Sequence, residues 1–97
     1  MGYELIVIGA STGGPRALAK VLGGLPGDLP VGVVVAQHIP SGFTRSLAER
    51  LDAQSALRVR EARDGDEIRS GTVLLCPGGR QITVERGSGK LLVRISD

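Results

Sequence analysis

The sequence has very few aromatic residues. Tyr3 and Phe43 are the only two among 97 residues, and tryptophan is absent. The core must therefore be filled by Val, Leu, Ile and Ala, which suits parallel strands that are buried on both faces. The chain also lacks a basic stripe, because its net charge of +2 is spread over interleaved acidic and basic residues. Without basic stripes or aromatic stacking platforms, the sequence argues against a nucleic-acid-binding protein.

Cysteine and long apolar runs are equally scarce. Cys76 is the only cysteine, which excludes an internal disulfide and a cysteine-based zinc cluster, and it is predicted to be a small buried residue. No apolar run approaches the ~18 residues of a membrane span, and no charged-then-apolar leader follows Met1. We therefore expect a cytoplasmic protein without membrane insertion.

The residues that are present predict one α/β domain. Strands are predicted at residues 3–8, 31–36, 57–62, 72–76, 81–85 and 91–95, and helices at 15–22 and 43–52. The first two strands are almost continuously apolar, as in a parallel sheet, and the last two form a predicted hairpin. Ser41 is predicted to cap the second helix and Phe43 to pack beneath it. The expected fold is a doubly wound, mostly parallel α/β sheet with a β-α-β-α-β start and a C-terminal β-hairpin.

A glycine-rich turn, Gly9–Pro15, follows the first predicted strand. A phosphate-binding loop is excluded because Pro15 and Arg16 occupy the positions that need lysine and a hydroxyl residue. A dinucleotide-binding turn is disfavoured because Ser11 replaces the middle glycine of that motif. Asp64-Gly65-Asp66 matches no calcium loop and is predicted to be a solvated turn. No cofactor and no metal ion are expected.

The same turn fits the nucleophile elbow, G-x-S-x-G. In such an elbow the glycines allow a sharp strand-to-helix turn that exposes the oxygen of Ser11. The amide of Thr12 would then lie at a helix N-terminus, where it can stabilise an oxyanion. The pattern alone is weak, and a purely structural turn is an equally good reading.

The only histidine favours the catalytic reading. His38 follows the second predicted strand, 27 residues after Ser11. One strand–helix–strand unit takes about 30 residues, so both side chains are predicted at the same edge of neighbouring parallel strands. A lone histidine at a strand end is more often structural. A histidine that lies one strand–helix–strand unit after a G-x-S-x-G motif instead predicts Ser-His hydrolase chemistry.

Together these motifs resemble the catalytic domain of the bacterial chemotaxis protein-glutamate methylesterase. The similar segments lie in order along the whole chain, at Ile8–Pro15, Gln37–Thr44, Leu47–Asp52, Val59–Asp66 and Cys76–Gln81. The resemblance implies that residues 1–97 are the N-terminal portion of such a domain. It identifies the protein as a carboxylic-ester hydrolase that removes methyl groups from methylglutamate on the cytoplasmic helices of chemoreceptors, with glutamine deamidation as a related activity.

The resemblance also assigns residues and partners. Ser11 is the implied nucleophile, His38 the general base and the Thr12 amide an oxyanion donor. Chemoreceptors are the implied substrates, and a receiver domain or a chemotaxis kinase are further candidate partners. Because the chain begins just before its first strand, we expect no receiver domain within it.

Two departures from the family pattern matter. The family's triad aspartate belongs to a segment beyond Asp97, and none of this chain's aspartates matches it; they are Asp28, Asp52, Asp64, Asp66 and Asp97. Gln81 stands where the family usually has histidine. Losing the triad aspartate costs roughly ten-thousandfold in rate in well-studied triads. Two alternatives therefore stay open, a non-catalytic interaction module of this fold and a generic serine esterase.

Overall fold

The computed structural model describes residues 5–10, 14–37 and 41–97. Every predicted strand and helix is present close to its predicted position. The elements are β1 (Leu5–Ala10), α1 (Gly14–Gly23), β2 (Gly32–Gln37), α2 (Thr44–Gln54), β3 (Arg58–Glu61), β4 (Thr72–Leu75), β5 (Gln81–Gly87) and β6 (Lys90–Ser96). No helix in these ranges is long and apolar enough to cross a membrane.

Four strands form a parallel sheet in the order β1-β2-β4-β3, and β5 and β6 form a separate antiparallel pair. The central strand β2 pairs with β1 on one side and with β4 on the other. Its three successive valines, Val33–Val35, are at most 2% exposed, so both of its faces are covered. The continuous apolar run in the sequence therefore predicted the most buried strand correctly.

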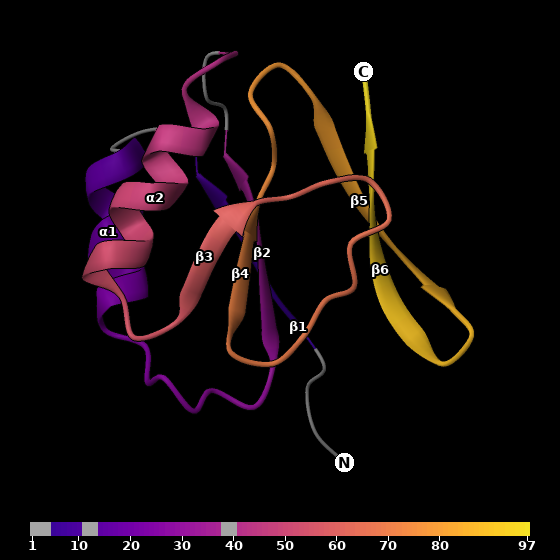
Figure 1. Ribbon diagram of the computed structural model, residues 1–97, viewed down its shortest axis with the longest axis horizontal. Helices are drawn as coiled ribbons and strands as arrows, with labels where there is room; N and C mark the ends of the chain where they lie inside the picture. The colour runs from indigo at the N-terminus through magenta and orange to yellow at the C-terminus, as the bar shows by residue number, and fades with distance from the viewer. Residues whose placement is uncertain (1–4, 11–13, 38–40) are drawn as a thin grey trace.

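Both helices lie on one face of the sheet (Figure 1). The apolar stripe of α1, which includes Leu18 and Leu22, packs with Leu47 and Leu51 of α2 against the odd-numbered valines of β2. The helical spacing of these leucines places them on one side of each helix. This layer contains the larger of the two buried clusters.

The hairpin β5–β6 covers the opposite face (Figure 1). Val93 of β6 is fully buried and packs with Val34 and Leu74 of the sheet. The segment between β3 and β4 also joins this layer, because Ile68 donates a backbone hydrogen bond to Leu91 and packs in the same cluster. The α/β class, the parallel sheet and the C-terminal hairpin are confirmed. The two helices cover one face of the parallel sheet, and the hairpin covers the other.

Two expectations about the start of α2 are wrong. The helix begins at Thr44, and its N-cap residue, Phe43, makes no side-chain capping bond, so Ser41 does not cap it. Phe43 is 63% exposed and does not pack beneath the helix. Phe43 itself takes the N-cap position ahead of Thr44, and the Thr44 hydroxyl accepts a hydrogen bond from Gly78 N in the loop after β4.

Candidate active site

The carboxyl ends of β1, β2 and β4 meet at one edge of the sheet. In the β1–β2 register Ala10 lies opposite Gln37, and the Cys76 amide just after β4 donates to Val35 O at 2.9 Å. In open parallel sheets this edge is where ligands bind. Ser11 and Thr12 follow Ala10 in sequence, and His38 follows Gln37. These three residues lie outside the described residues, so their roles stay predictions.

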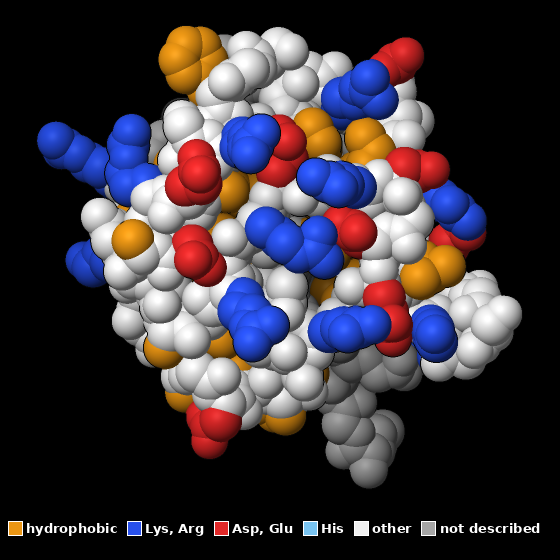
Figure 2. Space-filling view, viewed as in Figure 1, with side chains coloured by type: hydrophobic (Ala, Val, Ile, Leu, Met, Phe, Trp, Pro, Cys, Tyr) orange, Lys and Arg blue, Asp and Glu red, His pale blue; other side chains and the backbone are white. Residues whose placement is uncertain are grey.

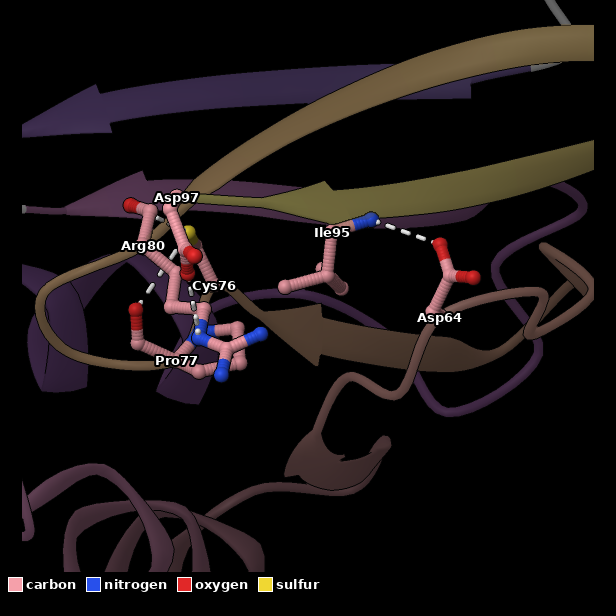
Figure 3. Close-up of polar contacts among 6 residues, drawn as sticks. All are labelled: Asp64, Cys76, Pro77, Arg80, Ile95 and Asp97. Carbon is pink, nitrogen blue, oxygen red and sulfur yellow. Dashed lines mark hydrogen bonds and ion pairs between the residues drawn. The ribbon is translucent and has the colours of Figure 1, made fainter.

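The segment after β4 forms a tight turn at this edge. Arg80 N donates to Pro77 O at 3.1 Å, and Gly79 takes a φ of +78°, a conformation that favours glycine at the third position of such a turn. The Cys76 thiol donates to Arg80 O at 3.3 Å (Figure 3). The Pro-Gly-Gly sequence therefore gives a tight, hydrogen-bonded turn beside the end of β2.

Cys76 has a structural role in this turn. Its side chain is 4% exposed, and burial raises the pKa of the thiol. A buried thiol with a raised pKa stays protonated at neutral pH, so it is a poor nucleophile and a suitable hydrogen-bond donor. The sequence-based prediction of a small buried residue is confirmed.

Thr44 connects two of the loops at the edge, and the sequence analysis did not single it out. Gly78 N donates to Thr44 Oγ1 at 2.6 Å, across 34 residues of sequence. The Thr44 side chain is 1% exposed although it is the first residue of α2. The only signal in the sequence was its place at a predicted helix start, which is typical of a cap.

An open cleft of about 420 Å³ lies at this edge of the sheet. Its walls come from the segments that follow β2, β3 and β4, with Ile95 of β6 on one side. The lining includes Ser41, Gly42, Ala62, Arg63, Pro77, Gly78 and Arg80. Two of the lining residues, Ser41 and Gly42, follow His38 closely in the sequence, and the cleft lies where the carboxyl ends of β2, β3 and β4 meet, so it is the candidate substrate site.

Charges of both signs surround the cleft. Arg80 pairs with Asp97 at 3.3 Å, between two exposed side chains, and Figure 3 shows this pair beside Cys76 and Pro77. Arg63 is exposed and makes no ion pair with the part of the chain that the structure describes. Figure 2 shows basic and acidic side chains interleaved over the face of the molecule that is seen in Figure 1, in agreement with the interleaved charges of the sequence.

Four of the aspartates have structural partners. Asp52 Oδ1 accepts from Val59 N at 2.8 Å, and Asp64 Oδ1 accepts from Ile95 N at 2.9 Å (Figure 3). Asp66 pairs with an arginine of β3 at 2.8 Å, and Asp97 pairs with Arg80. These contacts fix loops and strand ends. The predicted turn at Asp64-Gly65-Asp66 is present, but its carboxylates are bonded to neighbouring strands.

Gln81, which occupies the family's histidine position, is the first residue of β5. It is exposed and lies opposite Ser96 in the hairpin. It follows the turn residue Arg80 directly, so the side chain at this position is carried by a regular strand.

Comparison with known proteins agrees with this architecture. The sequence profile described as CheB methylesterase matches residues 6–97. Over 95 residues the chain is 53% identical to a protein-glutamate methylesterase/protein-glutamine glutaminase of Moorella thermoacetica, which covers 98% of this chain and 22% of that protein. A protein of the same name from Symbiobacterium thermophilum is 59% identical over 82 residues, covering 84% of this chain and 23% of that one.

A solved structure is similar over nearly the whole chain. The Thermotoga maritima CheB methylesterase catalytic domain superposes with a TM-score of 0.91 at 43% identity. The match covers 99% of this chain and 51% of that domain. The chain thus spans about half of the solved catalytic domain and less than a quarter of those two curated relatives. The matching profile, the sequence identity and the shared fold show that this chain belongs to the CheB methylesterase family.

Proposed function

We propose that this chain carries the nucleophile and the general base of a protein-glutamate methylesterase. The observation that carries the proposal is the parallel register of β1 and β2, which pairs Ala10 with Gln37. Ser11 and His38 are the next residues in sequence after this pair. Relatives named protein-glutamate methylesterase/protein-glutamine glutaminase are more than half identical to the chain.

In the first half of the proposed reaction, Ser11 Oγ attacks the ester carbonyl of a methylglutamate side chain. His38 removes the hydroxyl proton as the bond forms. The amide of Thr12 stabilises the negative oxygen of the tetrahedral intermediate. The intermediate collapses when the C–O bond to the methoxy group breaks, and His38 returns the proton so that methanol leaves.

In the second half, water hydrolyses the glutamyl-serine ester. His38 takes a proton from the water, the new oxyanion forms and collapses, and the proton returns to Ser11 Oγ. The products are a glutamate carboxylate and the free enzyme. The same steps convert glutamine to glutamate, with ammonia as the leaving group in place of methanol. No cofactor or metal ion takes part.

The chain by itself is expected to be a weak catalyst. Its aspartates match no triad position of the family, and four of the five hold structural contacts. Without a carboxylate to orient the imidazole, the rate falls roughly ten-thousandfold in well-studied triads. We propose that the remaining part of the catalytic domain supplies this third group.

We propose the cytoplasmic helical region of methyl-accepting chemoreceptors as the substrate and the cytoplasm as the location. Receptors of this kind carry methylated glutamates on helices, and the open cleft beside the turn at Pro77–Arg80 offers an accessible surface for a helix. A receiver domain or a chemotaxis kinase would act as a regulatory partner.

The test is methanol release from methylated receptor fragments. It compares the 97-residue chain with a version extended through the rest of the catalytic domain, each with and without Ser11→Ala. Ser46→Ala, which alters an exposed serine of α2, is the matched control. We expect the extended enzyme to be active, Ser11→Ala to abolish turnover and Ser46→Ala to leave it unchanged.

Each other outcome contradicts a defined part of the proposal. Turnover that survives Ser11→Ala removes the assigned nucleophile. An extended enzyme that hydrolyses only small esters is a generic serine esterase. An extended protein that binds receptor fragments without releasing methanol is an interaction module.

A further inference from the structure

Arg63 is an exposed arginine in the wall of the candidate substrate cleft. Its guanidinium forms no ion pair with the part of the chain that the structure describes. Two carboxylates, those of Asp64 and Asp66, nevertheless lie within three residues of it in the sequence. The guanidinium stays free because both carboxylates bind other groups.

The contacts of these two carboxylates are local. Asp66 Oδ2 accepts from Arg60 Nη1 and from the backbone amide of Arg63, each at 2.8 Å. Asp64 Oδ1 accepts from Ile95 N at 2.9 Å. Both carboxylates of the turn thus hold backbone groups or another arginine, and the side chain of Arg63 is left without an acidic partner.

The same contacts fix the backbone of Arg63. Its amide donates to Asp66 Oδ2, and its carbonyl accepts from the amide of Asp66 at 3.0 Å, which closes the turn. The preceding residue, Ala62, is 2% exposed, and its amide donates to Leu75 O at 2.8 Å. A free guanidinium is therefore attached to a well-held backbone, which reduces the conformational freedom that is lost when it binds a partner.

Arg63 also joins the cleft to a second hollow. This hollow of about 390 Å³ is bounded by α2 and β3, and both Glu61 and Arg63 line it as well as the cleft. Its lining includes Arg45 of α2, which also has no ion pair among the described residues, and the carboxylate of Glu49. A partner that occupies both hollows is therefore elongated and passes over Arg63.

The proposed substrate offers carboxylates to such a guanidinium. Hydrolysis of a methylglutamate leaves a glutamate, so a helix with several such sites carries carboxylates near the sites that are still methylated. Side chains that are four residues apart lie on the same face of a helix. A planar guanidinium binds a carboxylate through two parallel hydrogen bonds, which makes the contact specific as well as attractive.

We propose that Arg63 is a specificity-determining residue, which pairs with a carboxylate of the substrate helix one turn away from the reacting methylglutamate. The enzyme thereby prefers helices that are acidic around the site to neutral ones. Glu61 opposes this pairing, because it lines the same two hollows and repels the same carboxylate. This inference rests on the function proposed above, and Arg63 takes no part in bond breaking.

The test measures binding to the extended catalytic domain with Ser11→Ala, which removes the proposed nucleophile. The probe is a helical receptor fragment with one methylglutamate, made with either glutamate or alanine at the positions four residues before and after it. Arg63→Gln removes the proposed partner, and Glu61→Gln removes the opposing charge. Arg58→Gln is the matched control, because it alters an exposed arginine of β3 that lines neither hollow.

We expect Arg63→Gln to weaken binding of the glutamate fragment by about fivefold and to leave binding of the alanine fragment unchanged. Glu61→Gln should tighten binding of the glutamate fragment, and Arg58→Gln should change the binding of neither. The effect of Arg63→Gln should shrink as the salt concentration rises. Equal losses for the two fragments, or equal effects of Arg63→Gln and Arg58→Gln, overturn the proposal.

Turnover by the extended enzyme gives a second measurement. Arg63→Gln should raise KM for the glutamate fragment and leave kcat unchanged, because the pair forms equally in the bound substrate and in the transition state. A lower kcat at an unchanged KM overturns the assigned role. The binding measurement does not require methanol release. A protein that binds through Arg63 but releases no methanol therefore contradicts only the esterase proposal, so the two failures are distinguishable.

Discussion

At the scale of single residues, Asp52 protects an exposed strand edge. β3 is at one end of the sheet, so the amides on its outer side have no neighbouring strand. Asp52, in the last turns of α2, accepts the Val59 amide at 2.8 Å and so pairs one of them. A carboxylate that blocks an edge amide reduces the chance that another chain pairs there.

Removing this carboxylate should destabilise the chain. Asp52→Ala leaves the Val59 amide without its partner and should lower the free energy of unfolding by about 1–2 kcal/mol, as measured by urea denaturation. Asp52→Asn keeps an acceptor oxygen and should lose less. Asp28→Ala, at an exposed loop position, is the control. Equal stability of the Asp52→Ala and Asp28→Ala variants would contradict the role of Asp52.

The buried thiol of Cys76 should make stability depend on pH and should slow alkylation. Burial raises the pKa of this thiol, so the folded chain favours its protonated form. The stabilisation this gives is present below the pKa of an unfolded thiol and is lost as the pH rises through the raised pKa. Alkylation at neutral pH should therefore be about tenfold or more slower in the folded chain than in urea. Similar rates in both conditions, with a short cysteine peptide as reference, would show that the thiol is accessible.

At the scale of elements, the start of β2 is defined by a close approach. A Cβ added to Gly32 would meet Ile68 Cγ2 and lie 2.9 Å from Arg69 O, in the segment between β3 and β4. The glycine is therefore required by space, because a backbone carbonyl cannot move aside easily.

Gly32→Ala should push this segment away from the sheet. The expected loss is about 2 kcal/mol of unfolding free energy, measured by thermal or urea denaturation. Gly87→Ala in β5 is the matched control, because a Cβ there meets nothing within 4 Å. If Gly32→Ala and Gly87→Ala lower the free energy of unfolding equally, the close approach at Gly32 has no energetic consequence.

The sequence predicted the elements well because their signals are local. The valines of β2, the leucine spacing of α1 and the glycines that end it each depend on a few neighbouring residues. The order of the strands could not be predicted, since the place of β4 between β2 and β3 depends on contacts between distant segments. The same limit applies to Thr44, whose partner Gly78 is reached only through the fold. Ser11 and His38 were found from motif spacing, and their roles stay predictions.

At the scale of the whole molecule, the hairpin is part of the core. Val93 is fully buried against the sheet, whereas Val84, opposite it in the hairpin, is 36% exposed. Gly65 N and Asp66 O, between β3 and β4, each form a backbone bond to Val93. The two sheets are therefore joined by apolar packing and by backbone hydrogen bonds.

This arrangement predicts one cooperative unfolding transition. Val93→Ala should lower the free energy of unfolding by about 2 kcal/mol, and Val84→Ala by less than half of that. Within each variant, far-ultraviolet circular dichroism of the whole chain and hydrogen exchange in β6 should report the same unfolding transition. A hairpin that exchanges well before the sheet unfolds would show that it is an independent unit.

The strand order also has a consequence for synthesis on the ribosome. β3 leaves the ribosome before β4, yet β4 lies between β3 and the rest of the sheet. Until Thr72–Leu75 has emerged, β3 has no strand partner and is held only through α2. During this interval the nascent chain therefore exposes unpaired strand edges, which are prone to aggregation. The insertion of β4 is the step that joins β3 to the other strands.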